Sequence, residues 1–332
     1  MLCLGIETSC DETAAAVVRD GRVALSDVVS TQIDIHRRWG GVVPEVASRN
    51  HVVQVMPVIH EALTRAQVGL SDLDVIAVTR GPGLQGALLV GLQVAKAMGL
   101  ARGLPVVGVN HLEGHLLAAR LLVDAPEPPF LALVVSGGHT TAYAVAQFGQ
   151  YEKVGSTRDD AAGEAYDKVA RLLGLGYPGG VQIDRLAQTG NPEAIRFPRA
   201  LPERATFDWS FSGLKTSVLT WTKSHGVPQG QALNDLCASF QEAVADALTK
   251  KLLLAARAKN LKTLVLCGGV AANSRLRALA QERCTGAGLK LFLPPPALCT
   301  DNGAMIAVAG TLAFSRGAGA TMELGADPTW RL

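Results

Sequence analysis

The sequence has few aromatic side chains, almost no net charge and no long apolar run. Phe, Trp and Tyr make up 5% of the 332 residues, and 31 Lys and Arg face 29 Asp and Glu. A net charge this small is not that of a polyelectrolyte, so a contact with nucleic acid must come from a local patch or a partner. Gly, Pro or a charge interrupts every apolar stretch before the ~18 residues of a transmembrane helix. We therefore expect no membrane partner.

Signals of three other protein classes are also missing. The six cysteines form no C-x-x-C pair, and several of them stand within apolar runs. Reduced, buried thiols are typical of a cytoplasmic protein, and the start of the chain, MLCLGIETSC, lacks the basic segment of a signal peptide. No G-x-x-x-x-G-K-[ST] segment occurs, which excludes a P-loop.

Small and apolar residues are abundant in the chain. Hydrophobic residues make up 48% of the chain, and 35 residues are glycine. Such a composition buries a large core and favours close packing of helices on a sheet, so we predict an α/β fold. The best internal boundary is the segment DAPEPP at 124–129, where Pro-containing steps interrupt both the helical and the strand pattern of apolar residues. We predict two lobes, 1–125 and 126–332, with the last helix able to pack back on the first lobe.

The second lobe restarts the pattern of the first. The first lobe begins with a strand at 2–7, an acidic turn and a strand at 14–18. The second lobe begins in the same way, with a strand at 130–135, the turn S-G-G-H-T and a strand at 141–146, so that Ile6 corresponds to Val135. This layout predicts an internal duplication. Further strands are expected at 74–79, 104–109 and 263–267, helices at 51–68, 87–100, 232–258 and 302–313, and irregular structure over 155–225.

The segment GPGLQG at 81–86 matches the G-x-G-x-x-G pattern between a strand and a helix. A dinucleotide site would also need an acidic residue at the end of the next strand, which here ends in Asn110. Pro82 removes a backbone donor where a phosphate would need one. A tight structural turn is the better interpretation.

His111 and His115 are spaced i, i+4 at the start of a predicted helix. Their side chains then project from one face and could share a divalent metal. The alternative is one capping and one core histidine. Glu113 stands between them as H-L-E-G-H, so the zincin pattern H-E-x-x-H and its protease chemistry are not supported. Asp301, in the turn C-T-D-N-G before a helix, is either an N-cap or a third ligand.

Two glycine loops and one acidic turn follow buried strands. S-G-G-H-T at 136–140 and C-G-G-V-A-A-N at 267–273 would expose backbone N–H groups to an anion. Together with the acidic turn E-T-S-C-D-E-T at 7–13 they are typical of the divided phosphate site of an actin-type ATPase. Isolated acids in Gly-rich or turn settings are Asp11, Glu12, Asp167, Asp184 and Asp301.

Taken together, these blocks resemble one family, the tRNA N6-adenosine threonylcarbamoyltransferases, over nearly the whole chain. The resemblance rests on G-I-E-T-S-C-D-E-T at 5–13, G-G-V-V-P-E-V-A-S-R-N-H at 40–51, G-P-G at 81–83, N-H-L-E-G-H at 110–115, S-G-G-H-T at 136–140, G-E-A-Y-D-K-V-A at 163–170, F-S-G-L-K-T at 211–216, G-G-V-A-A-N at 268–273 and T-D-N-G-A-M-I at 300–306.

The resemblance implies an actin/hexokinase/Hsp70-like (ASKHA) fold of two duplicated lobes, with the active site in the cleft between them. It implies that His111, His115 and Asp301 are metal ligands, with iron (Fe2+) as the metal and zinc as the alternative. It also implies contacts to the nucleotide or acyl-adenylate by Val134, Val135, Ser136, Gly137, Gly138, Asp167, Gly180, Asp184 and Asn273.

The implied reaction moves a threonylcarbamoyl group from threonylcarbamoyl-AMP to the adenosine beside the anticodon of tRNAs that read ANN codons. The implied partners are tRNA, a paralogous TsaB-like subunit and a small TsaE-like ATPase. Asp11 and Glu12, on the first turn, are the candidates for the base that takes the amine proton, with plain turn capping as the alternative. Arg37, Arg38 and Arg49 form the best local basic patch, at 36–49.

Two rival functions use the same fold. One is a non-catalytic binding subunit, because paralogues of this fold lose their metal ligands. The other is an ATP-dependent sugar or acetate kinase, which brings Mg²⁺ in with ATP and needs no histidine pair. The intact set His111, His115 and Asp301 argues against both.

Overall fold

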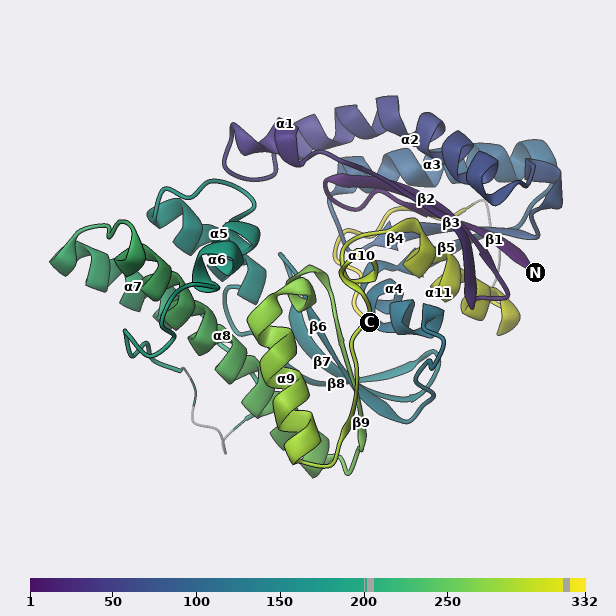
Figure 1. The fold of residues 1–332 in the computed structure, drawn as a ribbon. Helices are drawn as coiled ribbons and strands as arrows, with labels where there is room; N and C mark the ends of the chain where they lie inside the picture. The colour runs from purple at the N-terminus through teal and green to yellow at the C-terminus, as the bar shows by residue number, and fades with distance from the viewer. Residues whose placement is uncertain (200, 202–205, 319–322) are drawn as a thin grey trace. The chain divides into compact units, whose positions relative to one another are not determined.

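The computed structural model describes residues 1–199, 201, 206–318 and 323–332, and the chain forms two compact units (Figure 1). The first unit consists of residues 1–125 together with 297–332, and the second of residues 126–296. The division made from the sequence assigned 126–332 to the second lobe, with the last helix able to pack back on the first lobe. The structure shows this second arrangement: Ala297–Leu332 belongs to the first unit, because the last long helix packs against its sheet.

A five-stranded mixed sheet forms the centre of the first unit. The strands β1 and β2 form an antiparallel hairpin, and β3 pairs antiparallel with β2. On the other side of β1, the strands β4 and β5 continue the sheet parallel to it. In spatial order they are β3 (Val23–Thr31), β2 (Glu12–Arg19), β1 (Leu2–Glu7), β4 (Val75–Gly81) and β5 (Val106–Asn110). Because β1, β4 and β5 are parallel, their carboxyl ends meet at one edge.

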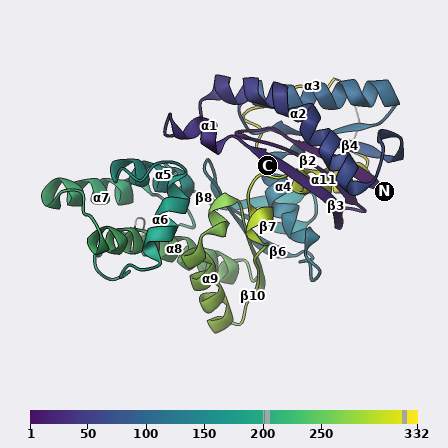
Figure 2. The ribbon, with the colours of Figure 1, turned by 45° about the horizontal axis from the view of Figure 1, so that its top comes forward.

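Helices cover both faces of this sheet (Figures 1 and 2). The helices α2 and α3 pack together on one face, and α11 and α4 pack together on the other. The helices of this unit are α1 (Ile33–Arg37), α2 (Pro44–Ala66), α3 (Gln85–Arg102), α4 (His111–Leu117) and α11 (Gly303–Ser315). Within the described ranges, no helix combines the length and the apolar character needed to cross a bilayer.

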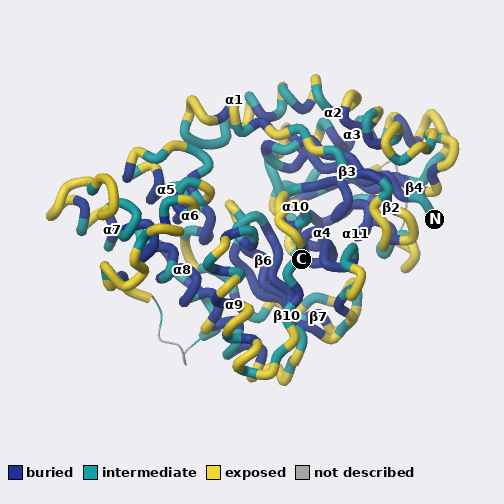
Figure 3. Tube along the Cα trace, in the orientation of Figure 1, coloured by how far each residue is buried: buried dark blue, intermediate teal, exposed yellow. Residues whose placement is uncertain are grey.

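The second unit repeats the sheet of the first. Its strands lie in the order β10 (Lys290–Phe292), β9 (Thr263–Cys267), β6 (Phe130–Val135), β7 (Thr140–Gln147) and β8 (Gln150–Ser156). Again three strands are antiparallel neighbours and two are parallel to the first of them. The predicted repeat is therefore confirmed, with β1, β2, β3, β4 and β5 corresponding to β6, β7, β8, β9 and β10. The central strands of both sheets are largely buried, whereas the edge strands β3 and β8 are mostly not (Figure 3).

The prediction of irregular structure over 155–225 is wrong. That region contains α5 (Ala162–Leu172), α6 (Gly179–Ala187) and α7 (Ser212–His225), which precede the long α8 (Gln231–Ala258) and α9 (Ser274–Gly286). The three helices are short, and a stretch rich in glycine and proline separates the first two, so no long run of helical spacing marks them. Apolar residues at helical spacing, such as Ala162, Ala165, Tyr166 and Val169, were the available signal.

The helix α11 lies unusually close to the first sheet because glycines stand at the contact. A methyl group on Gly5 would lie 2.2 Å from the carbonyl oxygen of Gly303, and one on Gly303 would lie 2.5 Å from the backbone of Ala15. Further along the helix, a methyl group on Gly310 would lie 2.2 Å from the side chain of Ala77. The first nine residues of α11 are all buried. Close approach of backbone to backbone therefore fixes where this helix begins.

We predict that Gly5→Ala destabilises the protein by about 1–3 kcal/mol, the usual cost of overpacking. The new methyl group would meet backbone atoms of α11, which cannot rotate away as a side chain could. The measurement is urea denaturation. Gly286→Ala is the matched control, because a methyl group there meets nothing within 4 Å and Ala favours a helix. Equal midpoints for Gly5→Ala and the wild type would contradict the prediction.

Candidate functional site

A capped helix places two histidines side by side in the first unit. The strand β5 ends at Asn110, whose side-chain oxygen accepts hydrogen bonds from the backbone N–H groups of Leu112 (2.9 Å) and Glu113 (3.4 Å). This N-cap starts α4 at His111. One helical turn later, the ring of His115 lies 4.7 Å from that of His111, centroid to centroid. Both rings are buried.

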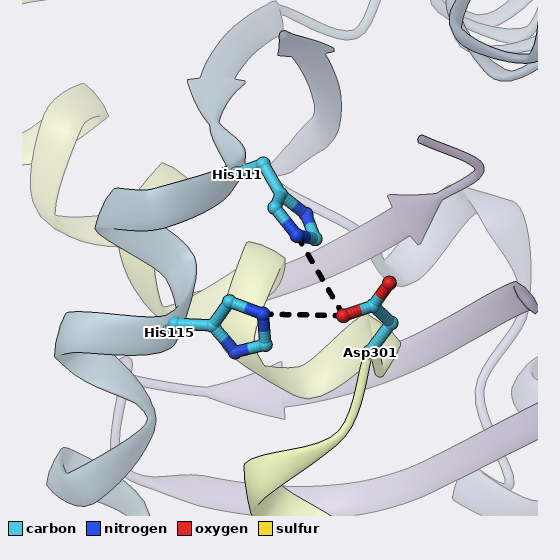
Figure 4. Close-up of side chains that lie close together, drawn as sticks. All are labelled: His111, His115 and Asp301. Carbon is cyan, nitrogen blue, oxygen red and sulfur yellow. Dashed lines mark ion pairs between the residues drawn. The ribbon is translucent and has the colours of Figure 1, made fainter. Parts of the chain in front are cut away.

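Asp301 lies against this pair (Figure 4). Its Oδ1 atom is 3.1 Å from Nε2 of His115 and 3.6 Å from Nε2 of His111. The N-cap of α11 is Asn302, whose side chain accepts the N–H of Met305, so the alternative in which Asp301 caps this helix is wrong. Because its neighbour Asn302 caps the helix, the side chain of Asp301 faces the histidines instead.

The cluster of His111, His115 and Asp301 has the donors and the spacing that suit a metal. One ligand atom from each of the three lies within 4.8 Å of the others. Ligands about 2.0–2.1 Å from a shared zinc ion lie roughly 3 Å from one another, close to the 3.1 and 3.6 Å that separate Asp301 from the two histidines. Among the described residues, neither ring nitrogen of the fully buried His115 makes a hydrogen bond, although Nε2 lies 3.1 Å from Oδ1 of Asp301. A metal ion between these two atoms would satisfy the buried Nε2 atom.

Behind the cluster lies Glu7, which the sequence analysis did not select as a site residue. Its side chain is fully buried and accepts hydrogen bonds from the backbone N–H of Ser9 and the hydroxyl of Thr79, the latter at 2.6 Å. Its Oε2 atom lies 3.1 Å from Nδ1 of His111. The signal available in the sequence was its place at the end of a strand parallel to those that end near Thr79 and His111.

The charges of Glu7 and His111 shift the pKa of each other. Burial alone would raise the pKa of Glu7, but the charge of His111 and the hydrogen bonds from His111 and Thr79 outweigh it and lower that pKa. For His111, burial alone would lower the pKa, but the carboxylates of Asp301 and Glu7 raise it to about 9. A metal ion would therefore displace a proton from His111 on binding.

The two candidate bases are adjacent in the acidic turn, and Glu12 is close enough to Asp301 to be affected by its charge. Asp11 is buried, with 8% of its surface exposed, and its backbone oxygen accepts the N–H of Gln32. Glu12 begins β2 and accepts a hydrogen bond from the hydroxyl of Thr31. Burial, followed by the negative charges of Asp11 and Asp301, raises the pKa of Glu12 to about 10. The acidic turn thus brings a third and fourth carboxyl group toward the metal-ligand candidates.

In the second unit, the predicted glycine loops lie side by side. The strand β6 contributes the buried Val134 and Val135, and the turn after it closes through Ser136, whose backbone N–H donates to the oxygen of His139. Gly268 has a φ of 89°, and a methyl group there would lie 2.5 Å from the carbonyl oxygen of Val135. Gly137 and Gly138 are exposed, and a methyl group on either would meet nothing within 4 Å.

The remaining adenylate-site candidates also have structural roles at helix ends. Asp167 accepts the N–H of Gly179 at the start of α6, next to Gly180. Asp184 accepts hydrogen bonds from both the backbone and the hydroxyl of Ser274 at the start of α9. Asn273 caps α9 through Leu276, and its amide donates to Gln241 at 2.7 Å. These bonds tie α6 and α9 to the second glycine loop.

A further pair of acids, which the sequence analysis missed, joins two of the blocks noted there. Asp159 accepts hydrogen bonds from Ser210 and Ser212 at the start of α7. Asp160 forms ion pairs with Lys168 of α5 and Lys215 of α7, at 2.8 and 3.3 Å. The pKa of each acid lies below its ordinary value, because these donors outweigh the partial loss of solvent around the carboxylates. The segments at 163–170 and 211–216 are thus held together by this loop.

Solved structures of other proteins show the same fold at low sequence identity. HypF of T. kodakarensis matches 97% of this chain and 49% of its own length, with 15% identity and a TM-score of 0.65. Component A of the Acidaminococcus fermentans (R)-2-hydroxyglutaryl-CoA dehydratase matches 95% of this chain and 99% of its own, with 15% identity and a TM-score of 0.57. The predicted actin/hexokinase/Hsp70-like fold class is confirmed by these likenesses.

Sequence relatives are far more similar. A protein of Anaeromyxobacter dehalogenans (strain 2CP-C) is 67% identical over 330 residues, which cover 99% of both chains, and one of Syntrophus aciditrophicus (strain SB) is 56% identical over 333 residues, covering 100% of this chain and 98% of that one. Both are named tRNA N6-adenosine threonylcarbamoyltransferase, and the model of that family matches residues 23–308. The chain therefore belongs to the tRNA N6-adenosine threonylcarbamoyltransferase family, whose members are transferases that modify tRNA.

Proposed function

We propose that this chain transfers the threonylcarbamoyl group of threonylcarbamoyl-AMP to the exocyclic amine of the adenosine beside the anticodon, in tRNAs that read ANN codons, and releases AMP. The observation that carries the proposal is the cluster of His111, His115 and Asp301 in a chain of this family. A non-catalytic paralogue would not need the cluster, and a kinase of this fold would bring its metal in with ATP.

His111, His115 and Asp301 would hold one divalent metal ion, iron (Fe2+) in this proposal, with zinc as the alternative. The bound ion would polarise the carbonyl oxygen of the threonylcarbamoyl group and stabilise the charge that develops there. Two neutral imidazoles and one carboxylate suit either metal, because both accept nitrogen and oxygen donors. Deprotonation of His111 accompanies binding, since the metal and a proton compete for the same nitrogen.

Asp11 and Glu12 are the proposed acceptors of the proton that the attacking amine must lose. Asp11 lies in the turn after β1, and Glu12 begins β2. Burial, with the charges of Asp11 and Asp301, raises the pKa of Glu12 to about 10, so Glu12 carries a proton at neutral pH and could accept the amine proton only where a bound cation lowers that pKa. The reaction needs no serine or cysteine nucleophile, because AMP is a good leaving group and the amine attacks directly.

The adenylate would bind in the second unit on the loops at 136–138 and 268–273. The exposed backbone of Gly137 and Gly138 is open to a phosphate, and the backbone approach requires that no side chain stand there. The other proposed contacts are Val134, Val135, Ser136, Asp167, Gly180, Asp184 and Asn273.

We further propose that the protein is cytoplasmic and works with tRNA, a paralogous subunit and a small ATPase. In the basic patch at 36–49, Arg37 pairs with Asp34, whereas Arg38 lies over the ring of Trp39. Arg49 stands on α2, one turn before the exposed, apolar Val52 and Val53. A chain with a net charge of only +2 offers few unpaired cationic side chains to the phosphates of tRNA. A partner subunit that adds cationic side chains would therefore strengthen tRNA binding.

His115→Ala should remove the metal and leave the fold intact. The contacts of His115 are with Asp301 and the ring of His111, which are the other two proposed ligands, whereas His111→Ala would also strand the buried charge of Glu7. Elemental analysis of purified protein is expected to give about one metal ion per wild-type chain and almost none for the variant. His60→Ala, at an exposed position of α2, is the control and should keep its metal. Unchanged metal content in His115→Ala would show that His115 is not a metal ligand.

Gly137→Val should weaken AMP binding at least about tenfold, because a branched side chain blocks the approach of a phosphate to the backbone. The position has room for a side chain, so the thermal midpoint should stay near that of the wild type. Gly268→Val is not a useful second test, because its side chain would collide with Val135 and distort the turn. Calorimetric titration with AMP is the measurement, and wild-type affinity in Gly137→Val would exclude this loop.

The reaction itself is tested with the wild-type chain, its partner proteins, tRNA and threonylcarbamoyl-AMP. Modified adenosine and AMP should form in equal amounts, and a preparation that forms neither would refute the proposed function. Asp11→Asn or Glu12→Gln should slow transfer by about 10²–10⁴-fold with unchanged metal content, the usual contribution of a general base. Full rates in both variants would exclude only the assignment of the base.

A further inference from the structure

Three donors converge on the buried carboxylate of Glu7. The backbone N–H of Ser9 donates to Oε1, and the hydroxyl of Thr79 donates to Oε2. Nδ1 of His111 lies 3.1 Å from the same Oε2 atom and 3.2 Å from the hydroxyl oxygen of Ser9. Glu7 and Thr79 are both fully buried, so bulk solvent does not reach these bonds.

This geometry decides which nitrogen of His111 keeps its proton when the ring is neutral. A carboxylate can only accept hydrogen bonds, so an unprotonated Nδ1 atom would direct its lone pair at the negative oxygen of Glu7. A protonated Nδ1 atom donates to that oxygen, and Ser9 Oγ can accept a share of the same proton. The opposite nitrogen, Nε2, faces Asp301. It is therefore the nitrogen that remains available to a metal.

We propose that Glu7 is a positioning residue that fixes the Nδ1–H tautomer of His111 and so presents Nε2 as a metal ligand. This inference rests on the proposed metal site and adds to it a residue outside the ligand set. The arrangement is a carboxylate–histidine pair behind a metal, in which the carboxylate also sets the ring orientation and makes the ring a better donor. Glu7 can hold this place because three parallel strands end together: β1 at Glu7, β4 just after Thr79 and β5 just before His111.

Glu7→Gln should reverse the tautomer preference of His111, from a proton on Nδ1 to a proton on Nε2. The N–H of Ser9 can only donate, so it keeps the amide oxygen of the glutamine on its side. The NH₂ group then takes the place of Oε2 and faces Nδ1 of His111. To accept from that NH₂ group, Nδ1 must lose its proton, and the remaining proton moves to Nε2, where it competes with the metal. The hydroxyl of Thr79 can turn and accept instead of donating.

The matched control is Thr79→Val, which removes one donor to the same oxygen and leaves the carboxylate facing His111 unchanged. We would strip metal from the full-length wild type and both variants and measure Zn²⁺ affinity by competition with a fluorescent chelator. Zn²⁺ serves as the probe because it is redox-inert and accepts the same donors. Glu7→Gln is expected to lower the affinity by about 10–100-fold, and Thr79→Val by much less.

A second readout needs no variant. Protein labelled with ¹⁵N in its histidines should show, in the Zn²⁺-bound wild type, a protonated Nδ1 and a metal-bound Nε2 for His111. An Nδ1-bound metal would overturn the proposal even if Glu7→Gln failed to fold. Equal Zn²⁺ affinity of Glu7→Gln and the wild type, or equal losses in Glu7→Gln and Thr79→Val, would also overturn it. A wild type that binds no Zn²⁺ would instead overturn the metal site, and this inference with it.

Discussion

The close approach of α11 to the first sheet is the constraint on which the candidate metal site depends. Gly5 and Gly303 leave no room for a Cβ atom between the strand and the helix, so the start of α11 is fixed against β1. Asp301 lies two residues before that start, and α11 also packs against α4, which carries the histidines. A ligand from the last tenth of the chain thereby meets two ligands from its first half.

The same edge of the sheet gathers the polar groups of the site. The strands β1, β4 and β5 are parallel, so their carboxyl ends bring Glu7, Thr79 and His111 together, in the position where open α/β sheets commonly bind ligands. The second unit repeats the arrangement, because β6 and β9 are parallel and each ends in a glycine loop. One sheet pattern thus supports a cluster of charged ligand candidates in one unit and an open glycine loop in the other.

Regular elements with strong periodicity could be predicted from the sequence, and the weaker ones could not. The strands at 2–7, 130–135 and 263–267 agree with β1, β6 and β9 because they are continuous apolar runs between turn residues. The exposed β8 and the three-residue β10 have no such run, since pairing with a neighbour rather than their own pattern forms them. Short helices such as α5 were lost among glycines and prolines, because their stability comes from packing rather than from length.

The sequence by itself determined the family, the fold class and the residue types of the site, since these follow from motifs and from spacing along the chain. It placed His111 and His115 on one helical face, because the period of a helix is fixed. It could not decide whether Asp301 caps a helix or faces the histidines, nor reveal that Glu7 lies behind His111. Only the tertiary structure decided these points, because both depend on contacts between segments far apart in the chain, which packing and strand order create.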